Sequence, residues 1–148
     1  MPSSYTSLHY HLVFATKHRE PLIAPACRAE LHRYMGGVVR ENEGMALSVG
    51  NVEDHVHLLV GLKPTHRLSD VMRALKTSSS AWAKARCRFP GFRWQDGYSA
   101  FTVSASGTAS VRRSIERQEA HHRSRTFRDE LIAYLRATGV DFDERFLD

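Results

Sequence analysis

Two histidines separated by one residue, His55 and His57, lie in a stretch that predicts a β-strand. Residues 52–60 are rich in β-branched and apolar side chains. Because side chains alternate between the two faces of a strand, Val56 and Leu58 are expected in a core while both histidines point the other way. At a rise of ~3.3 Å per residue the two imidazoles can turn onto one metal ion. The alternative is a pair of solvated or hydrogen-bonded rings without a metal.

A second pair with the same spacing, His9 and His11, precedes it in the chain. Unlike His55, neither of these histidines is preceded by an aspartate. We therefore expect the pair His9 and His11 to have a structural role beside the site of a bound ligand. His121 and His122 lie at the end of a predicted helix, where a histidine commonly interacts with the negative end of the helix dipole.

The composition indicates one globular domain, residues 1–148, with an excess of positive charge. The chain has 42% hydrophobic and 25% charged residues and a formal net charge of +5, before any of its nine histidines is protonated. This balance favours a polyanionic partner such as nucleic acid. No apolar run approaches the ~20 residues needed to span a bilayer, and we expect no membrane partner.

The start of the chain and its two cysteines favour a reducing compartment. Residues 1–20 lack a basic end followed by an apolar stretch, so they do not resemble a signal peptide. Cys27 and Cys87 are far apart in the sequence and fall in predicted helices, so we expect two thiols rather than a disulfide. The expected location is the cytoplasm.

Hydrophobic periodicity predicts alternating strands and helices. Period-two alternation or β-branched runs predict strands over 8–14, 45–52, 52–60 and 98–103, and residues 104–108 are small and polar, which is typical of a loop. Helical spacing predicts helices over 25–44, from an N-cap at Ser69 to the break at Pro90, over 110–122, and from Thr126 to Gly139. The order β-α-β-β-α-β predicts an α+β, ferredoxin-like (split βαβ, RRM-like) antiparallel sheet with helices on one face plus C-terminal helices.

Several basic side chains could contact phosphate, although each could equally belong to a solvated surface. They lie in the loop after the first strand and on two of the predicted helices: Lys17, Arg19, Arg73, Lys76, Arg112, Arg113 and Arg117.

With these residues in hand, the chain resembles the small HUH transposases of the IS200/IS605 type, which include the REP-associated tyrosine (Y1) transposases. Four blocks carry the resemblance in the right order over nearly the whole chain: YHLVFATK (10–17), DHVHLL (54–59), WQDGYSAFTVS (94–104) and VRRSIERQEAHH (111–122). The resemblance implies an enzyme that cleaves and rejoins single-stranded DNA carrying hairpins, and a homodimer.

The resemblance also implies a metal site and a nucleophile. The two HUH histidines and a glutamine of the late helix map onto His55, His57 and Gln118, and such ligands suit Mg²⁺ or Mn²⁺ with open positions for phosphate oxygens. The nucleophilic tyrosine of the family, which forms a 5′-phosphotyrosine, maps onto Ser114. A serine hydroxyl is shorter and far less acidic than a phenol, so we expect impaired catalysis. Three explanations stay open for the serine at this position. The substitution is engineered; or the chain is a decayed or repurposed transposase; or another tyrosine, Tyr98 or Tyr134, acts as the nucleophile.

Two other functions stay open on the sequence alone. One is a non-catalytic binder of single-stranded DNA or RNA, which the missing tyrosine favours. The other is a zinc hydrolase that uses His55, His57 and either His121 or His122, with Glu53 as its nearest carboxylate in the sequence.

Overall fold

The computed structural model describes residues 4–87, 90–118 and 126–147. In this part of the chain, no helix is both long and apolar enough to cross a membrane. The helices and strands, in chain order, are β1 (His9–Ala15), α1 (Arg28–Glu41), β2 (Met45–Asn51), β3 (His55–Gly61), α2 (Leu68–Arg86), β4 (Ser99–Val103), α3 (Thr108–Glu116) and α5 (Phe127–Thr138), with short 3-10 helices at Lys17–Arg19, Pro25–Cys27, Ala105–Gly107 and Glu144–Phe146.

The strands form one antiparallel sheet in the order β2-β3-β1-β4. β1 pairs with β3 on one side, where Leu12 lies opposite Leu58, and with β4 on the other, where Leu12 lies opposite Ala100. β1 and β2 therefore run in the same direction with β3 between them, which is the split βαβ arrangement. The predicted α+β, ferredoxin-like sheet is confirmed.

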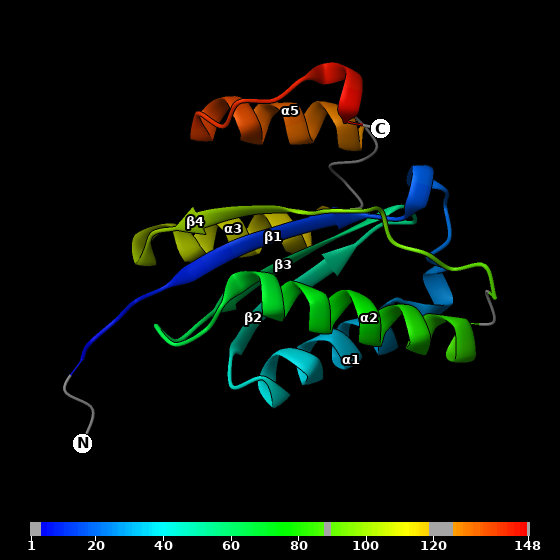
Figure 1. Ribbon diagram of the computed structural model, residues 1–148, viewed down its shortest axis with the longest axis horizontal. Coiled ribbons are helices and arrows are strands. Elements are labelled where there is room, and N and C mark those ends of the chain that lie inside the picture. Colours follow the sequence, from blue (N-terminus) through cyan, green and yellow to red (C-terminus); the bar gives the residue numbers. More distant parts are fainter. Residues whose placement is uncertain (1–3, 88–89, 119–125, 148) are drawn as a thin grey trace.

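The larger hydrophobic core lies between the sheet and the pair α1 and α2, which cover the same face (Figure 1). β1 and β3 contribute alternate side chains to it, as the period-two pattern predicts. The strand residues are Leu12, Phe14, Val56, Leu58 and Val60, and the fully buried helix residues include Leu31, Met35, Met72 and Leu75.

A smaller core lies on the opposite face, where α5 packs over the sheet (Figure 1). Phe127, Leu131 and Leu135 of α5 are buried against Val13 and Phe101 of the sheet, together with Ala15. The sequence predicts the apolar side of α5 but does not place it. The structure places it on the same face as His55 and His57.

The ends of α5 follow the sequence signals. The Thr126 hydroxyl accepts a hydrogen bond from the backbone N–H of Asp129 at 3.1 Å, which satisfies a donor in the first turn. Gly139 ends the helix with a φ of 71°, a left-handed conformation that costs glycine little.

Three details differ from the sequence prediction. α2 begins at Leu68 with Arg67 as its N-cap, and no side chain caps it, so Ser69 is not the cap. α3 ends at Glu116 rather than continuing to residue 122, because Arg117 leaves the helical conformation; residues 119–122 lie outside the described part. The expected loop 104–108 contains the 3-10 helix Ala105–Gly107.

The two cysteines form a disulfide, so the prediction of two free thiols is wrong for this structure. Cys27 closes the 3-10 helix before α1, and Cys87 follows α2. α1 and α2 pack side by side, and this brings the two Cα atoms to 6.0 Å across a separation of 60 residues. The sequence pattern predicts each helix but not which helix ends meet.

Reduction of this disulfide should lower the free energy of unfolding by about 4 kcal/mol, because a loop of this length loses much of its unfolded-state entropy when it is closed. The measurement is the urea midpoint with and without a reducing agent, with Cys27→Ala/Cys87→Ala as the matched variant. Equal midpoints, together with two titratable thiols before reduction, would contradict the disulfide.

Candidate metal centre

His55 and His57 project from β3 on the face that carries α5, and both side chains are completely buried. The predicted alternation is confirmed, since Val56 and Leu58 face the other core. Burial is the part that the sequence does not reveal. With α5 in place, neither imidazole has contact with solvent.

A third imidazole, His11 of β1, joins this pair. Its Nε2 lies 2.8 Å from Nδ1 of His57, and the two rings are stacked with centroids 5.0 Å apart. β1 and β3 are neighbours in the sheet, and their register sets Val13 opposite His57. His9, two residues earlier, lies at the open end of the strand near Ser7. Of the pair His9 and His11, it is therefore His11 that has the expected structural role, because it orients the ring of His57.

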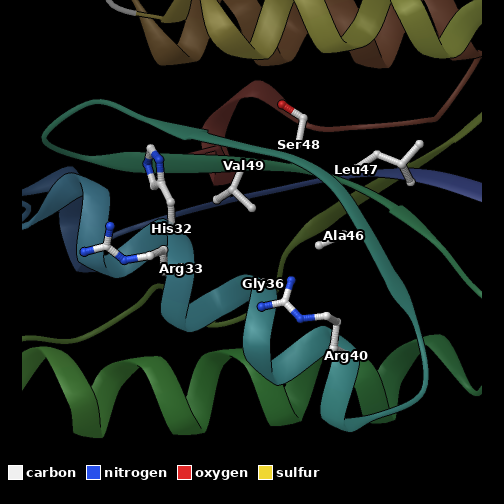
Figure 2. Close-up of a pocket in the computed structure, with 8 residues that line it drawn as sticks. All are labelled: His32, Arg33, Gly36, Arg40, Ala46, Leu47, Ser48 and Val49. Atoms are coloured by element: carbon white, nitrogen blue, oxygen red, sulfur yellow. The ribbon is translucent and has the colours of Figure 1, made fainter.

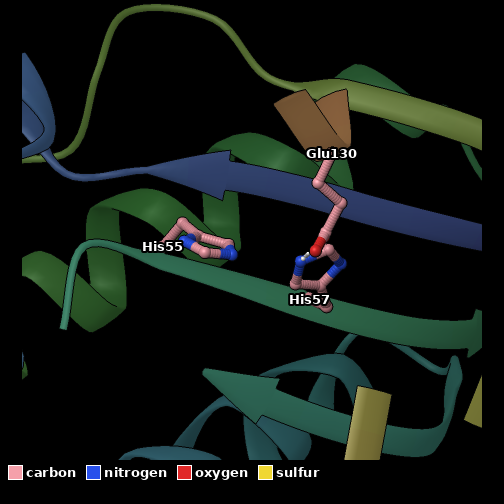
Figure 3. Close-up of side chains that lie close together, drawn as sticks. All are labelled: His55, His57 and Glu130. Atoms are coloured by element: carbon pink, nitrogen blue, oxygen red, sulfur yellow. Dashed lines mark ion pairs between the residues drawn. The ribbon is translucent and has the colours of Figure 1, made fainter. Parts of the chain in front are cut away.

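Glu130 completes the cluster from α5, and the sequence analysis did not select it. Its Oε1 lies 2.8 Å from Nε2 of His57, and the residue is only 6% exposed (Figure 3). The signal was present in the sequence. Glu130 stands three residues after Phe127 and immediately before Leu131, which puts a carboxylate inside the apolar stripe of a helix.

A carboxylate lies against each of the two imidazoles. Asp54 Oδ1 lies 2.7 Å from Nδ1 of His55, so a metal ion on His55 would bind through Nε2. An ionised Glu130 favours a proton on Nε2 of His57, so that Nδ1 of the same ring accepts from Nε2–H of His11. Burial, and secondarily the charge of His57, lowers the pKa of His11 to about 3, against the opposing effect of the Glu130 carboxylate. His11 is therefore neutral at physiological pH.

The donor set fits a divalent cation. One ligand atom each from His55, His57 and Glu130 lies within 4.8 Å of the others, and all three side chains are buried. Two imidazoles and a carboxylate are ligands that Mn²⁺ and Zn²⁺ commonly bind. Mg²⁺ can bind the same set when phosphate or water oxygens complete its coordination.

Ser114 lies in the last turn of α3, and Gln118 follows the end of this helix, so the continuous helix expected over both residues is interrupted at Arg117. Nε2 of Gln118 donates to the backbone carbonyl of Ser114 at 3.3 Å, and Gln118 is 2% exposed. α3 packs on β2, where the backbone of Ile115 meets Gly50, the residue paired with His57. The end of α3 therefore lies on the histidine face of the sheet, beside β2.

The two tyrosines considered as substitutes for Ser114 are in different surroundings. Tyr134 lies one turn after Glu130 on α5, and its ring centroid is 5.0 Å from that of His11 and 6.4 Å from that of His57. Tyr98 is exposed and lies in the surface hollow that Lys17 and His18 also line. The structure therefore brings Tyr134, and not Tyr98, to the histidine cluster.

The basic residues selected from the sequence are spread over the surface. Arg113 and Arg117 are exposed at the end of α3. Arg112 donates to the backbone carbonyl of Leu47 at 2.8 Å and lies 3.6 Å from Glu116.

The remaining basic residues are in the loop after β1 and on α2. Lys17 and Arg73 form surface ion pairs of 3.6 Å with Asp96 and Asp70, and Arg19 adopts a left-handed backbone conformation. The Lys76 ammonium donates to the carbonyls of Gln95 and Gly97 at 2.6 and 2.7 Å, so its charge holds that loop. His121 and His122 lie outside the described residues.

Comparison with known proteins gives one consistent result. A family model described as "Transposase IS200 like" matches residues 4–118. The ISDra2 transposase TnpA of Deinococcus radiodurans is 26% identical over 117 residues, which cover 75% of this chain and 84% of that protein.

Two solved structures share the fold. A crystal structure of a candidate transposase from D. radiodurans R1 aligns with a TM-score of 0.65 and 28% identity, over 80% of this chain and 95% of that one. A REP-associated tyrosine transposase bound to a REP hairpin aligns with a TM-score of 0.61 and 14% identity, over 82% of this chain and 73% of that one. The second likeness concerns the fold alone.

Gly50→Ala should displace α3 from its position on β2. An added Cβ would lie 2.4 Å from the carbonyl oxygen and 2.7 Å from Cγ2 of Ile115. Relief of this overlap requires α3 to shift, and we expect a loss of roughly 1–3 kcal/mol in stability. Gly91→Ala is the matched control, since nothing lies within 4 Å of its added Cβ. Thermal and urea unfolding of both variants is the measurement, and equal stability of the two would contradict the packing described.

Proposed function

The chain belongs to the IS200-like transposase family, and from this premise we propose that it binds hairpin-containing single-stranded DNA at a divalent-metal site built on β3. The observation that supports this most directly is the buried cluster of His55, His57 and Glu130, which contains both HUH histidines of the family. The hairpin bound to the REP-associated tyrosine transposase supports the same class of DNA partner.

His55 and His57 would hold the cation with Glu130 as the third ligand, and Gln118 is the ligand that the resemblance implies in addition. Mg²⁺ or Mn²⁺ is the proposed metal, and when bound it would supply positive charge that stabilises a reacting phosphate. The surrounding side chains act on the ligands. Asp54 and His11 each fix the orientation of one imidazole through its Nδ1 atom.

Burial of both imidazoles has a consequence for the substrate. A phosphate group can meet the ligand atoms of His55 and His57 only when α5 moves away from the sheet, because Phe127 and Tyr134 of this helix lie against the imidazoles. This movement would withdraw Glu130 as well, so Glu130 is the proposed third ligand in the DNA-free protein, and phosphate takes its place when DNA binds. A second copy of the chain in a homodimer, which the resemblance implies, could exchange helices at this point. A cytoplasmic location is part of the same proposal and rests on the family resemblance, since the Cys27–Cys87 disulfide removes the cysteine argument for a reducing compartment.

We propose that strand cleavage and rejoining through a 5′-phosphotyrosine are impaired in this chain, because Ser114 stands at the nucleophile position. In the intact reaction the phenolic oxygen bonds to phosphorus, the bond from phosphorus to the 3′ oxygen breaks, and that oxygen takes up a proton. Tyr134 is the tyrosine whose ring lies closest to the cluster among those considered. A non-catalytic DNA-binding protein is the second candidate function, and Ser114 is the observation that favours it.

Glu130→Gln should weaken Mn²⁺ binding by more than about tenfold, because it removes the charged ligand and preserves the shape of the side chain. Asp129→Asn, an exposed neighbour on the same helix, should bind as the unaltered protein does. Isothermal titration with Mn²⁺ and, separately, Zn²⁺ makes the comparison.

If Gln118→Ala abolishes binding and Glu130→Gln does not, the third ligand is Gln118. Tight stoichiometric zinc with no Mn²⁺ response would favour a hydrolase over the proposed function. No cation bound by the unaltered protein would contradict the metal site.

Ser114→Tyr should restore a covalent protein–DNA adduct that the unaltered protein does not form. The protein is incubated with Mn²⁺ and a labelled oligonucleotide containing the hairpin that flanks its gene, and adducts are resolved on a denaturing gel. His57→Ala in the Ser114→Tyr background should remove the adduct.

An adduct from the unaltered protein would show that another residue attacks, and its loss in Tyr134→Phe would identify that residue. Binding by both proteins with no adduct from either would favour the non-catalytic function.

A further inference from the structure

A basic groove lies between α1 and the edge strand β2, away from the histidine cluster (Figure 2). It has a volume of about 270 Å³. Four residues of α1 line it, His32, Arg33, Gly36 and Arg40, and they face Ala46–Val49 of β2.

Small residues allow the helix and strand to form this groove. Gly36 has no side chain, and a Cβ there would lie 3.8 Å from Cβ of Ala46 and 3.4 Å from Nη1 of Arg40. The guanidinium of Arg40 therefore lies over the helix backbone at Gly36. On the strand side, the register of β2 shifts between Ala46 and Ser48, and Arg112 of α3 binds the carbonyl of Leu47 in this irregular segment.

The charge of the groove is positive and is not neutralised within the described part of the chain. Arg33 and Arg40 are exposed, and among the described residues neither guanidinium has a carboxylate within 4.0 Å. No aspartate or glutamate lines the groove. This differs from Arg112, which lies 3.6 Å from Glu116, and from Arg145, which lies 2.6 Å from Asp143. An anion is the complementary ligand.

A second hollow, of about 300 Å³, adjoins the groove and shares His32 and Val49 with it. It reaches Asn51, which is hydrogen-bonded to His32, and Gln118, which follows the end of α3. Its one carboxylate is Glu116, the partner of Arg112. The two hollows together lead from Arg40 to Ile115 and Gln118.

We propose that the groove between α1 and β2 binds the phosphodiester backbone of the DNA and directs the strand toward the end of α3. Arg33 and Arg40 each contact a phosphate. They are two turns of helix apart, about 10 Å along the axis. Each therefore contacts a different phosphate. This inference rests on the proposed DNA-binding function and adds to it a surface that neither the resemblance nor the sequence analysis selected.

Removal of the two charges should reduce both the affinity for DNA and its dependence on salt. Fluorescence anisotropy with the labelled flanking hairpin, in EDTA to exclude the metal site, gives the dissociation constant from 50 to 200 mM NaCl. For Arg33→Gln/Arg40→Gln we expect the slope of log K against log salt to fall by about 1.4–1.8, from two phosphate contacts. Over this range the unaltered protein should lose about tenfold more affinity than the variant.

Two comparison proteins make the result specific. Lys84→Gln/Arg86→Gln removes the same charge from exposed positions at the end of α2 and should leave the slope unchanged. Arg33→Lys/Arg40→Lys keeps the charge and should restore the slope.

The proposal is overturned if the unaltered protein binds with a salt-dependent affinity and Arg33→Gln/Arg40→Gln shows the same slope. It is also overturned if the Lys84→Gln/Arg86→Gln protein loses as much. If the unaltered protein binds no DNA, the proposed function itself fails, and the groove proposal fails with it.

Discussion

The contact between Glu130 and His57 is the interaction on which the arrangement of the candidate site depends. A carboxylate that is 6% exposed is costly to bury unless a partner compensates its charge. His57 provides that partner at 2.8 Å, and His11 occupies the other nitrogen of the same ring. α5 can therefore lie on the sheet only in the position that brings Glu130 to His57. The apolar residues of α5 stabilise its packing on the sheet through their burial, while the contact between Glu130 and His57 selects the position of the helix.

The two faces of the sheet have separate tasks. α1 and α2 bury the larger core on one face, and this core contains no member of the histidine cluster. The other face is covered by α5 and bordered by α3, and both helices bring residues to the cluster or to its edge. Because β1 and β3 alternate side chains between the faces, one pair of strands supports a stable core below and a polar site above. Changes in α3 or α5 can then alter the chemistry while the larger core remains intact.

Much of the fold could be predicted from the sequence, because its signals are local. The alternation in β1 and β3 and the apolar stripe of α5 depend on periodicity alone, and the capping of α5 by Thr126 and Gly139 depends on a few adjacent residues. The strand order followed from the β-α-β-β-α-β sequence of elements. The end of α3 at Glu116 and the start of α2 at Leu68 were missed, since neither boundary has a capping side chain.

The sequence by itself determined that His55 and His57 share one face of a strand, because the spacing of two residues requires it. It also determined the family, through four ordered blocks of residues. Only the tertiary structure decided that Glu130 and His11 join the pair, that Cys27 meets Cys87, and that Arg33 and Arg40 face an open groove. Each of these depends on which helix packs against which strand or helix. That choice is made by contacts between residues far apart in the chain, which no local pattern records.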